Sequence, residues 1–557
     1  MRSTRCTHPT GLIRVVGTAL PLLAMLWVAA ASADLGPYPV RDMELPAPHE
    51  IGPPVFAADP SLPTSPPPDP QVGDSWRWWL FIHVGMPHFE ERNCTVRGRS
   101  DHGYIVVEDS QWEVNIFQED VDALLDRWEN SSIGIHPDMG IYDINSYYFG
   151  APPDAMDDDE RIYQVWFDFG NTSDGFFFWF DQEPDGANPP YRSNECETVY
   201  LNTANGQDPA SDYMIAVTAH EFEHMIHWNY DVNEFSWVDE GLAEFAMWLY
   251  GHPDQISQFN SNPDNQLTQW NGTWADYIKT YLWTLYFYEN YGGRDAVYAV
   301  VHEPANSNSG YDLVLDDMGY TEDFADVFAD WVVANYLDDP SLADGRFGYE
   351  GDDLPPFSVA GSFSSYPVLN QTRTVNHWAA DYYRFTGFGE FSNIDWEFDG
   401  SDNNVFAVWC LALRGDGATD VLRMTIDPST QTGTLPVVGL THPDDEVILV
   451  VASTSTFGTT SYVFSAIPNL AAVGEGFATS IFSATPNPSR GSVEFRLPGS
   501  GPARIEVFDA QGRCVWQPPE TTSPALLWDG SRLAPGVYYA RLSRNGRTEE
   551  RELILLR

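Results

Sequence analysis

The chain has 557 residues, of which 43% are hydrophobic and 14% aromatic, so it can build packed cores and is not a disordered sequence. At roughly 100–200 residues per domain, this length predicts several domains. The formal net charge is −53, and a surface of that sign repels nucleic acids and anionic membranes, which excludes both as partners.

The first residues have the pattern of a secretory signal. Three arginines precede an apolar stretch over residues 15–31. This stretch ends in the small-residue sequence Ala31-Ser32-Ala33. We therefore expect a signal peptide over residues 1–33. No later segment reaches the roughly 20 apolar residues that a membrane-spanning helix needs, so we expect a secreted or cell-surface protein without membrane insertion.

The next segment, residues 34–75, is rich in proline and reads as an extended leader or linker. Strand patterns and one helical pattern follow, and then long stretches of helical periodicity. The expected strands cover 78–82, 104–107, 163–169 and 175–180, and the expected helices cover 121–128, 209–250, 274–291 and 322–337. Residues 76–352 thus predict a mixed sheet followed by a helical subdomain.

The helical signal ends after about residue 352. Apolar runs over 378–385 and 405–413, separated by Gly and Asp turns, predict a β-sandwich over residues 353–472. Short strands and the turn sequence Asp509-Ala510-Gln511-Gly512 predict a small Ig-like β-sandwich over residues 473–557. The expected fold class is therefore multidomain α+β.

Two local features allow more than one interpretation. Cys94 and Cys196 fall in one predicted domain, where they form either a disulfide or two buried thiols. The run Asp157-Asp158-Asp159 is typical of a solvated loop, and a Ca²⁺-binding loop is the second interpretation. No C-x-x-C pair occurs, which argues against a thiolate zinc site.

The central motif is His220-Glu221-Phe222-Glu223-His224, an H-E-x-x-H sequence inside a helical pattern. Residues four apart lie on one face of a helix, so both imidazoles can bind one Zn²⁺. Glu221 sits beside the first ligand, where its carboxylate can take a proton from a water molecule. The motif predicts two zinc ligands and a catalytic base.

A catalytic zinc site needs a third protein ligand, and two residues are candidates. His227 shares the helix of His220 and His224, and one straight helix rarely surrounds an ion with three side chains. Glu240 belongs to a second predicted helix that begins near Asp239, and we favour it as the ligand. Glu244 follows one turn later and can accept a hydrogen bond from a ligating imidazole. Exposed charges at a helix start are the alternative for both glutamates.

The segments AHEFEHMIHW (219–228) and WVDEGLAEFA (237–246) resemble the gluzincin branch of zinc peptidases, and most closely the hyicolysin-like family of secreted bacterial metallopeptidases. This resemblance implies a zincin-like catalytic domain with zinc held by His220, His224 and Glu240. It also implies that Glu221 is the base and that Glu244 supports the ligands. Asp239 stands where relatives often carry Asn.

Gluzincins also use a Tyr or His to stabilise the oxyanion of the tetrahedral intermediate. Tyr277, near the start of the expected helix over 274–291, resembles the tyrosine of aminopeptidase-type members, and Tyr281 lies one turn away. Aromatic packing in the core is the alternative for both. Tyr277 is the candidate that we retain as a catalytic residue.

The last part of the chain resembles the FlgD-like Ig modules and the type A sorting domains of the type IX secretion system. The resemblance is carried by NPSRGSVEFRLP (487–498), ARIEVFDAQGRCV (503–515) and LAPGVYYARL (533–542). It implies that this segment directs export, with the secretion machinery as a partner.

Taken together, these patterns predict a secreted zinc peptidase that acts on proteins or peptides, and we favour an endopeptidase. An aminopeptidase would need an acidic site for the free amine of its substrate, and the sequence shows no recognisable motif for one. A non-catalytic surface or adhesion protein, in which the β modules do the work, is the third hypothesis.

Overall fold

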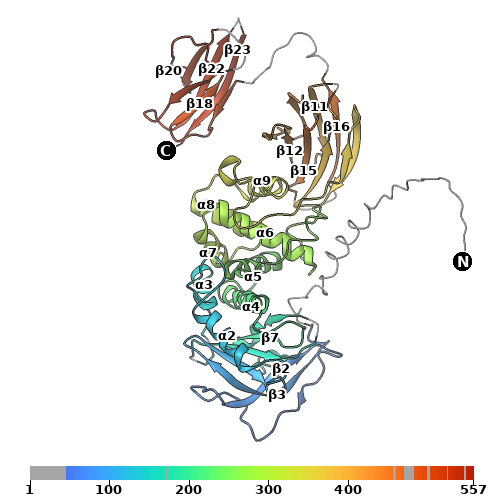
Figure 1. Ribbon diagram of the computed structural model, residues 1–557, viewed down its shortest axis with the longest axis vertical. Coiled ribbons are helices and arrows are strands. Elements are labelled where there is room, and N and C mark those ends of the chain that lie inside the picture. Colours follow the sequence, from blue (N-terminus) through green and yellow to red (C-terminus); the bar gives the residue numbers. More distant parts are fainter. Residues whose placement is uncertain are drawn as a thin grey trace, which may run out of the picture.

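The computed structural model describes residues 46–154, 156–157, 159–170, 173–389, 391–455, 460–469, 482–497, 502–523, 525–544 and 547–556. Within these ranges the chain forms eight α-helices and several β-sheets, which confirms the multidomain α+β class. A sheet unit, a helical region and a β-sandwich follow one another along the long axis (Figure 1). The predicted signal peptide, 1–33, and the start of the proline-rich segment lie outside the described residues.

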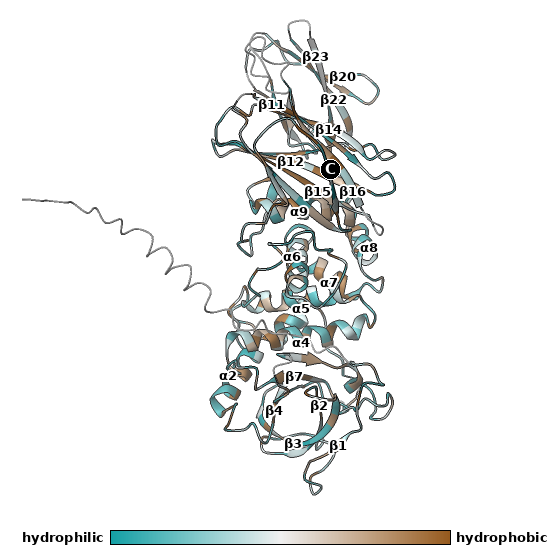
Figure 2. Ribbon diagram, turned by 90° about the vertical axis from the view of Figure 1, so that its right-hand side faces the viewer, coloured by the Kyte–Doolittle hydropathy of each residue, from teal (hydrophilic) through white to brown (hydrophobic). Residues whose placement is uncertain are grey.

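The N-terminal unit is a mixed sheet of seven strands in the order β1-β3-β4-β5-β7-β6, with β2 also paired to β3. The strands are β1 (Val55–Phe56), β2 (Ser75–Ile82), β3 (His88–Arg99), β4 (Gly103–Glu108), β5 (Ile162–Phe167), β6 (Gly175–Phe177) and β7 (Thr198–Asn202). β4, β5 and β7 run parallel, and β6 is an antiparallel edge strand. Seen end-on, the sheet curls strongly (Figure 2).

Both faces of this sheet are buried, as expected for parallel strands with continuous apolar sequences. Along β4, Tyr104 and Val106 belong to an aromatic core inside the curl, whereas Ile105 and Val107 belong to the core shared with the helices. Because side chains alternate along a strand, one short apolar run supplies both cores. The segment predicted as a strand over 175–180 is β6 followed by a 3₁₀ turn at Trp179–Gln182.

The inner core also contains Cys94 and Cys196, which are separate thiols and not a disulfide. Burial raises the pKa of both thiols well above the usual value, so they behave as small apolar side chains. Of the two open interpretations, the structure therefore supports buried thiols.

The helical region contains more helices than the sequence pattern indicates. The helices are α2 (Gln118–Glu129), α3 (Ile141–Tyr148), α4 (Asp212–Tyr230), α5 (Ser236–Tyr250), α6 (Trp274–Asn290), α7 (Arg294–His302), α8 (Asn308–Met318) and α9 (Phe324–Leu337). The periodic stretch 209–250 is two helices, α4 and α5, joined by the loop 231–235. The short helices α3, α7 and α8 were not predicted.

Local sequence explains where the two central helices begin and end. The Ser211 side chain accepts a hydrogen bond from the Met214 amide at the start of α4, as an N-cap serine does. Gly251 ends α5 with φ 108°, a conformation that favours glycine. Gly241 lets α6 lie close to α5, because a Cβ there would be 2.7 Å from Thr284 Oγ1 and 2.9 Å from Thr280 O.

The β-sandwich follows the helices. Its strands are β8 (Gly361–Phe363), β9 (Val368–Val375), β10 (Ala379–Phe385), β11 (Asn393–Gly400), β12 (Phe406–Leu413), β13 (Thr419–Arg423), β14 (Thr432–Val438), β15 (Glu446–Ser453) and β16 (Thr460–Pro468). They form a five-stranded sheet, β13-β12-β15-β10-β8, and a four-stranded sheet, β14-β11-β16-β9.

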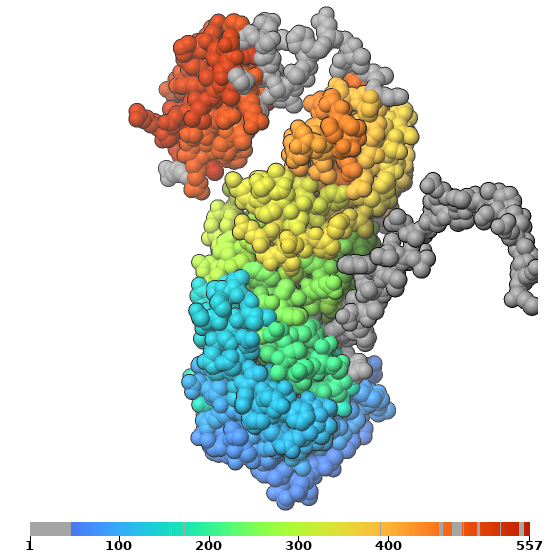
Figure 3. Space-filling view, viewed as in Figure 1, coloured from blue at the N-terminus to red at the C-terminus, as the bar shows by residue number. Residues whose placement is uncertain are grey.

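The five-stranded sheet also faces the helices. Along β10, Tyr383 and Phe385 enter the core between the two sheets, whereas Ala380 and Tyr382 join the helical core. The Tyr382 hydroxyl donates a hydrogen bond of 2.6 Å to Val332 O in α9. In the space-filling view the yellow and orange sandwich follows directly on the helices (Figure 3). The core is thus continuous across the predicted boundary near residue 352, and the boundary stays a prediction.

The C-terminal module is a small all-β unit, as predicted. Its strands are β17 (Ser483–Thr485), β18 (Ser492–Arg496), β19 (Arg504–Asp509), β20 (Cys514–Trp516), β21 (Ala525–Asp529), β22 (Gly536–Arg544) and β23 (Arg547–Leu555). They form sheets of three and four strands around a separate core that includes Phe495, Val507 and Trp528.

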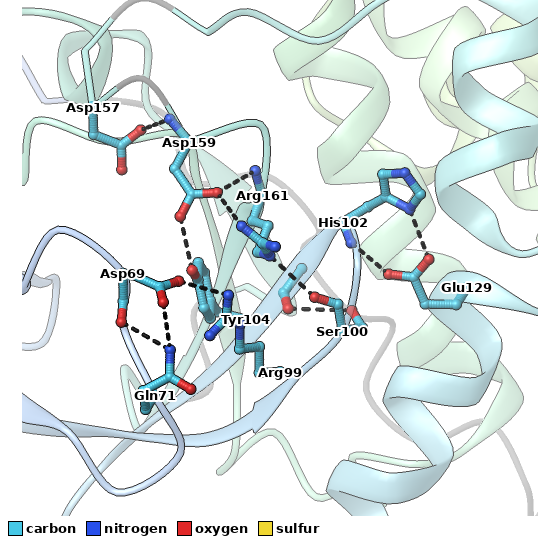
Figure 4. Close-up of polar contacts among 11 residues, drawn as sticks. Asp69, Gln71, Arg99, Ser100, His102, Tyr104, Glu129, Asp157, Asp159 and Arg161 are labelled. Carbon is cyan, nitrogen blue, oxygen red and sulfur yellow. Dashed lines mark hydrogen bonds and ion pairs between the residues drawn. The ribbon is translucent and has the colours of Figure 1, made fainter.

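Asp157 and Asp159, from the acidic run, accept hydrogen bonds from protein donors. Asp159 accepts hydrogen bonds of 2.7 Å from the Tyr104 hydroxyl and 2.7 Å from Arg161 Nη1, and Arg161 also donates to Ser100 O (Figure 4). A guanidinium beside the carboxylate disfavours a second cation there. Neither group of possible metal ligands found among the described residues includes Asp157 or Asp159, so the Ca²⁺ interpretation gains no support.

A buried carboxyl near this sheet makes stability depend on pH. Asp181 accepts hydrogen bonds of 2.7 Å from the Asn194 amide and 2.7 Å from the Tyr200 hydroxyl, yet burial raises its pKa from 3.8 to about 7. A group whose pKa is raised on folding stabilises the protein below its unfolded pKa, and the contribution is lost as the pH rises through the folded value.

We predict that the free energy of unfolding of the metal-free protein falls between pH 4 and pH 7, because of Asp181, by up to about 1.4 kcal/mol per pH unit. Urea unfolding in the presence of a chelator measures it. Asp181→Asn should give a shallower slope, and Asp316→Asn, at an exposed position in α8, should leave it unchanged. Equal slopes for Asp181→Asn and the unmodified protein would contradict the assignment.

Candidate metal centre

The first two candidate ligands lie one turn apart on α4. This helix is buried from Met214 to His227 between the sheet and the other helices. His220 Nε2 and His224 Nε2 are 3.1 Å apart, so the helix directs both imidazoles to one point, as the i, i+4 spacing predicts.

The third candidate ligand comes from the first turns of α5. Glu240 Oε2 lies 3.6 Å from His220 Nε2 and 3.8 Å from His224 Nε2. Tetrahedral zinc with bonds of about 2.0–2.1 Å keeps its ligand atoms roughly 3.3 Å apart. The two nitrogens and the carboxylate oxygen therefore fit a zinc ion in both chemistry and spacing. They form one of the two groups of possible metal ligands among the described residues.

Carboxylates also lie near the outer nitrogens of both imidazoles. Glu244 Oε1 is 3.5 Å from His220 Nδ1, and Asp239 Oδ2 is 3.2 Å from His224 Nδ1. Such partners orient a ligating imidazole and increase its basicity. The structure thus brings Glu244 to the place that the sequence indicated. It adds Asp239, which the sequence analysis treated only as a departure from related sequences.

His227 lies near the centre but does not join the three ligand atoms. Its Nδ1 is 2.7 Å from Asp239 Oδ1, so Asp239 lies between two imidazoles. Burial alone lowers the pKa of His227, but Asp239 outweighs it and raises that pKa to about 9. Desolvation raises the pKa of Asp239, but His224 and His227 outweigh it and hold that pKa well below the usual range. His227 therefore acts as a counter-charge for Asp239.

Glu223 is a further buried acid on the same helix. With His224 and Asp239 it forms the second group of possible metal ligands among the described residues. Burial raises the pKa of the Glu223 carboxyl to about 8. Its Oε2 lies 4.0 Å from His224 Nδ1.

The candidate base, Glu221, lies against the edge strand β6. A Cβ on Gly175 would be 2.6 Å from Glu221 Oε1 and 2.8 Å from its Cγ. The missing side chain of Gly175 thus creates the space for the Glu221 carboxylate. Because β6 and β7 also pack on α4, this sheet contacts the helix that carries two of the candidate ligands, and its place in the catalytic domain stays a prediction.

A cleft of about 230 Å³ opens at the centre. Its walls are aromatic and acidic: Phe176, Phe177, Trp179, His224, Trp228, Asp231, Val232, Glu234, Asp239 and Glu240 line it. The cleft therefore opens beside two of the three candidate ligands, His224 and Glu240. Most of these wall residues escaped the sequence analysis, because they come from three separate segments.

The candidate tyrosines are not among the residues that line this cleft. Tyr277 is 4% exposed and packs edge-on against Trp270, with ring centroids 4.8 Å apart. The Tyr281 hydroxyl donates a hydrogen bond of 2.7 Å to Asp352. The structure therefore does not bring either hydroxyl to the cleft wall, and a catalytic role for Tyr277 stays a prediction.

Comparison with known families identifies the C-terminal module. Residues 483–556 match the family described as "Secretion system C-terminal sorting domain". This match confirms the predicted type IX sorting segment, and the protein is secreted or displayed at the cell surface. In the part of the chain that the structure describes, each helix is too short or too polar to cross a membrane.

The remaining comparisons give only weak similarities. No curated protein matches the chain. Among solved structures, similarity is found to "Biofilm associated protein - BSP domain" (10% identity, TM-score 0.13, 35% of this chain and 52% of that chain). It is also found to a beta-1,2-glucanase from Parabacteroides distasonis (9% identity, TM-score 0.11, 30% and 28%) and to Bacillus licheniformis lipase BlEst2 in propeptide form (11% identity, TM-score 0.13, 65% and 87%).

The chain thus spans 52% and 28% of the lengths of the first two of these structures. At such TM-scores these similarities carry no argument about the fold or the chemistry of this chain.

The position of Asp239 gives a prediction about metal affinity. Asp239→Ala removes the carboxylate that contacts the imidazoles of His224 and His227. We therefore expect zinc affinity to fall about 10–100-fold. Asp239→Asn keeps one oxygen acceptor and should lose less. Competition titration with a chromogenic zinc chelator measures both variants. Unchanged affinity in Asp239→Ala would show that the carboxylate does not hold the His224 ring.

Proposed function

We propose that this chain is a secreted zinc-dependent peptidase, with a zincin-like catalytic unit formed by the N-terminal sheet and the helices α4 and α5. One observation carries the proposal. The nitrogens of His220 and His224 and an oxygen of Glu240 lie within 4.8 Å of one another, and His224 and Glu240 line a cleft. The gluzincin-like sequence around these residues supports it further.

His220, His224 and Glu240 would hold the ion, and Glu244 and Asp239 would orient the two imidazoles. Three protein ligands leave the fourth position of a tetrahedral ion open, as catalytic zinc sites require. Zinc bound in such a site polarises a carbonyl group and makes water acidic enough to react near neutral pH.

Glu221 would then move the protons. It follows His220 directly in α4, and its carboxylate occupies the space beside Gly175. From there it takes a proton from the attacking water and delivers that proton to the leaving amine. Because Glu221 is completely buried, its carboxylate is kept away from bulk water, which would otherwise compete for that proton.

The edge strand β6 suggests how a peptide would bind. Within the described ranges β6 pairs with β7 alone, so we propose that its other edge pairs with an extended peptide. Its residues Phe176 and Phe177 also line the cleft. A peptide that adds to β6 would thus run past the metal position. Neither end of the peptide needs to be free for this binding, which favours an endopeptidase.

We predict that Glu221→Gln keeps its zinc but loses turnover by about 10²–10⁴-fold, because the amide cannot accept the proton. Glu119→Gln, at an exposed position in α2, should retain activity. Zinc content by mass spectrometry and casein cleavage with and without a chelator are the measurements.

Full activity of Glu221→Gln would refute the mechanism. Pure protein that contains no zinc and cleaves nothing would instead favour the non-catalytic surface protein. Cleavage restricted to substrates with a free N-terminus would favour an aminopeptidase.

A second prediction concerns Gly175. Gly175→Ala places a methyl group against Glu221, so the carboxylate must move. A displacement of about 1 Å can lower turnover by about 100-fold. We expect that loss with zinc content unchanged. Gly389→Ala is the control, since its Cβ would meet nothing within 4 Å. If Gly175→Ala is fully active, the carboxylate does not act from the position seen here.

A further inference from the structure

The cleft beside the metal position is strongly acidic. Four of its ten lining residues are carboxylates, and none is Arg or Lys. The proposed peptidase would already use two of these four. Glu240 would hold the ion, and Asp239 lies between the imidazoles of His224 and His227.

The two remaining carboxylates differ in their contacts. Glu234 Oε1 accepts hydrogen bonds of 2.5 Å from the Phe235 amide and 2.8 Å from the Ser307 amide, so Glu234 fastens the loop 231–235 to the start of α8. Among the residues that the structure describes, Asp231 accepts one hydrogen bond, from the Asn233 amide to its Oδ1 at 3.2 Å.

Asp231 Oδ2 has no hydrogen-bond partner among the described residues, although the residue is only 6% exposed. A carboxylate that is removed from water without a partner is unfavourable unless a ligand supplies the missing donor. The loop that carries Asp231 is tied to the rest of the protein, because Asn233 Nδ2 donates a hydrogen bond of 2.8 Å to Asn306 Oδ1. Asp231 is thus held in place at the wall of the cleft.

Aromatic rings form the wall beside this carboxylate. Phe177 and Trp228 line the cleft with ring centroids 6.3 Å apart, and Trp179 adds a third aromatic side chain. Aromatic faces attract cations, and they contact the apolar stem of a long basic side chain. A carboxylate beside such faces selects an organic cation over a neutral or anionic group.

We propose that this cleft is a specificity pocket for a basic side chain of the substrate, whose charged end pairs with Asp231. The proposal rests on the proposed peptidase function and names its substrate class. Arginine fits best, because its planar guanidinium can donate to both oxygens of a carboxylate while it stacks on an aromatic ring.

Two other occupants fit the geometry less well. A second metal ion would need several ligands, and neither group of possible metal ligands among the described residues includes Asp231. The free amine of a substrate offers a similar charge but no stem for the aromatic walls. The experiment below separates the amine from the side chain.

The test uses the zinc-loaded full chain and peptides blocked at both ends. One central residue is Arg, citrulline or Glu, and mass spectrometry locates the cleaved bond. We expect kcat/KM for the Arg peptide to exceed that for the neutral citrulline peptide at least about tenfold, with Glu lowest. The cleaved bond should lie at a fixed distance from the Arg.

Asp231→Asn should bring the Arg-to-citrulline ratio of kcat/KM to about one. The amide retains an oxygen for the Asn233 amide, so the loop should keep its structure. Asp316→Asn removes the same charge from an exposed position in α8 that does not line the cleft, and it should keep the full preference.

Three results would overturn the proposal: no preference for Arg in the unmodified protein, a preference that persists in Asp231→Asn, or a preference seen only with a free N-terminus. Calorimetric titration with Nα-acetyl-arginine amide and its citrulline analogue tests the pocket without turnover. If no peptide is cleaved but Asp231-dependent arginine binding is measured, the peptidase function fails and the cation pocket stands. If peptides are cleaved but no Asp231-dependent arginine binding is measured, the peptidase function stands and the cation pocket fails.

Discussion

The crossing of α4 and α5 is the constraint on which the candidate site depends. Two imidazoles on one helix fix a direction but cannot surround an ion, so a carboxylate must come from a second helix. The loop 231–235 turns the chain back, and Gly241 lets α6 support α5 directly beside Glu240. Around the ligands this crossing gathers carboxylates whose mutual repulsion a divalent cation would relieve.

Carboxylates lie both at the candidate metal position and along the wall of the cleft. Asp239 is balanced by two imidazoles, whereas Asp231 has an oxygen without a hydrogen-bond partner among the described residues. One acidic side chain therefore organises the proposed metal ligands and another is available to a substrate. For the basic substrates that we propose, the overall charge of −53 would add a long-range attraction.

The sorting domain and the candidate metal site belong to separate parts of the chain. The sorting domain has its own small core and accounts for export, but it supplies none of the candidate ligands. The sheet, the helices and the β-sandwich share a continuous core, so the sandwich is built onto the unit that holds the candidate site. Its outward-facing residues on β10 make that attachment.

The sequence by itself determined the features that follow from spacing within one element. The H-E-x-x-H motif placed His220 and His224 on one helix face, the apolar run over 104–107 indicated a strand, and the C-terminal motifs indicated export. Only the tertiary structure decided which segments meet. It brought Gly175 against Glu221 and Asp239 between two imidazoles, kept Cys94 and Cys196 apart, and left Tyr277 packed on Trp270. Such contacts join residues far apart along the chain, and local periodicity carries no information about them.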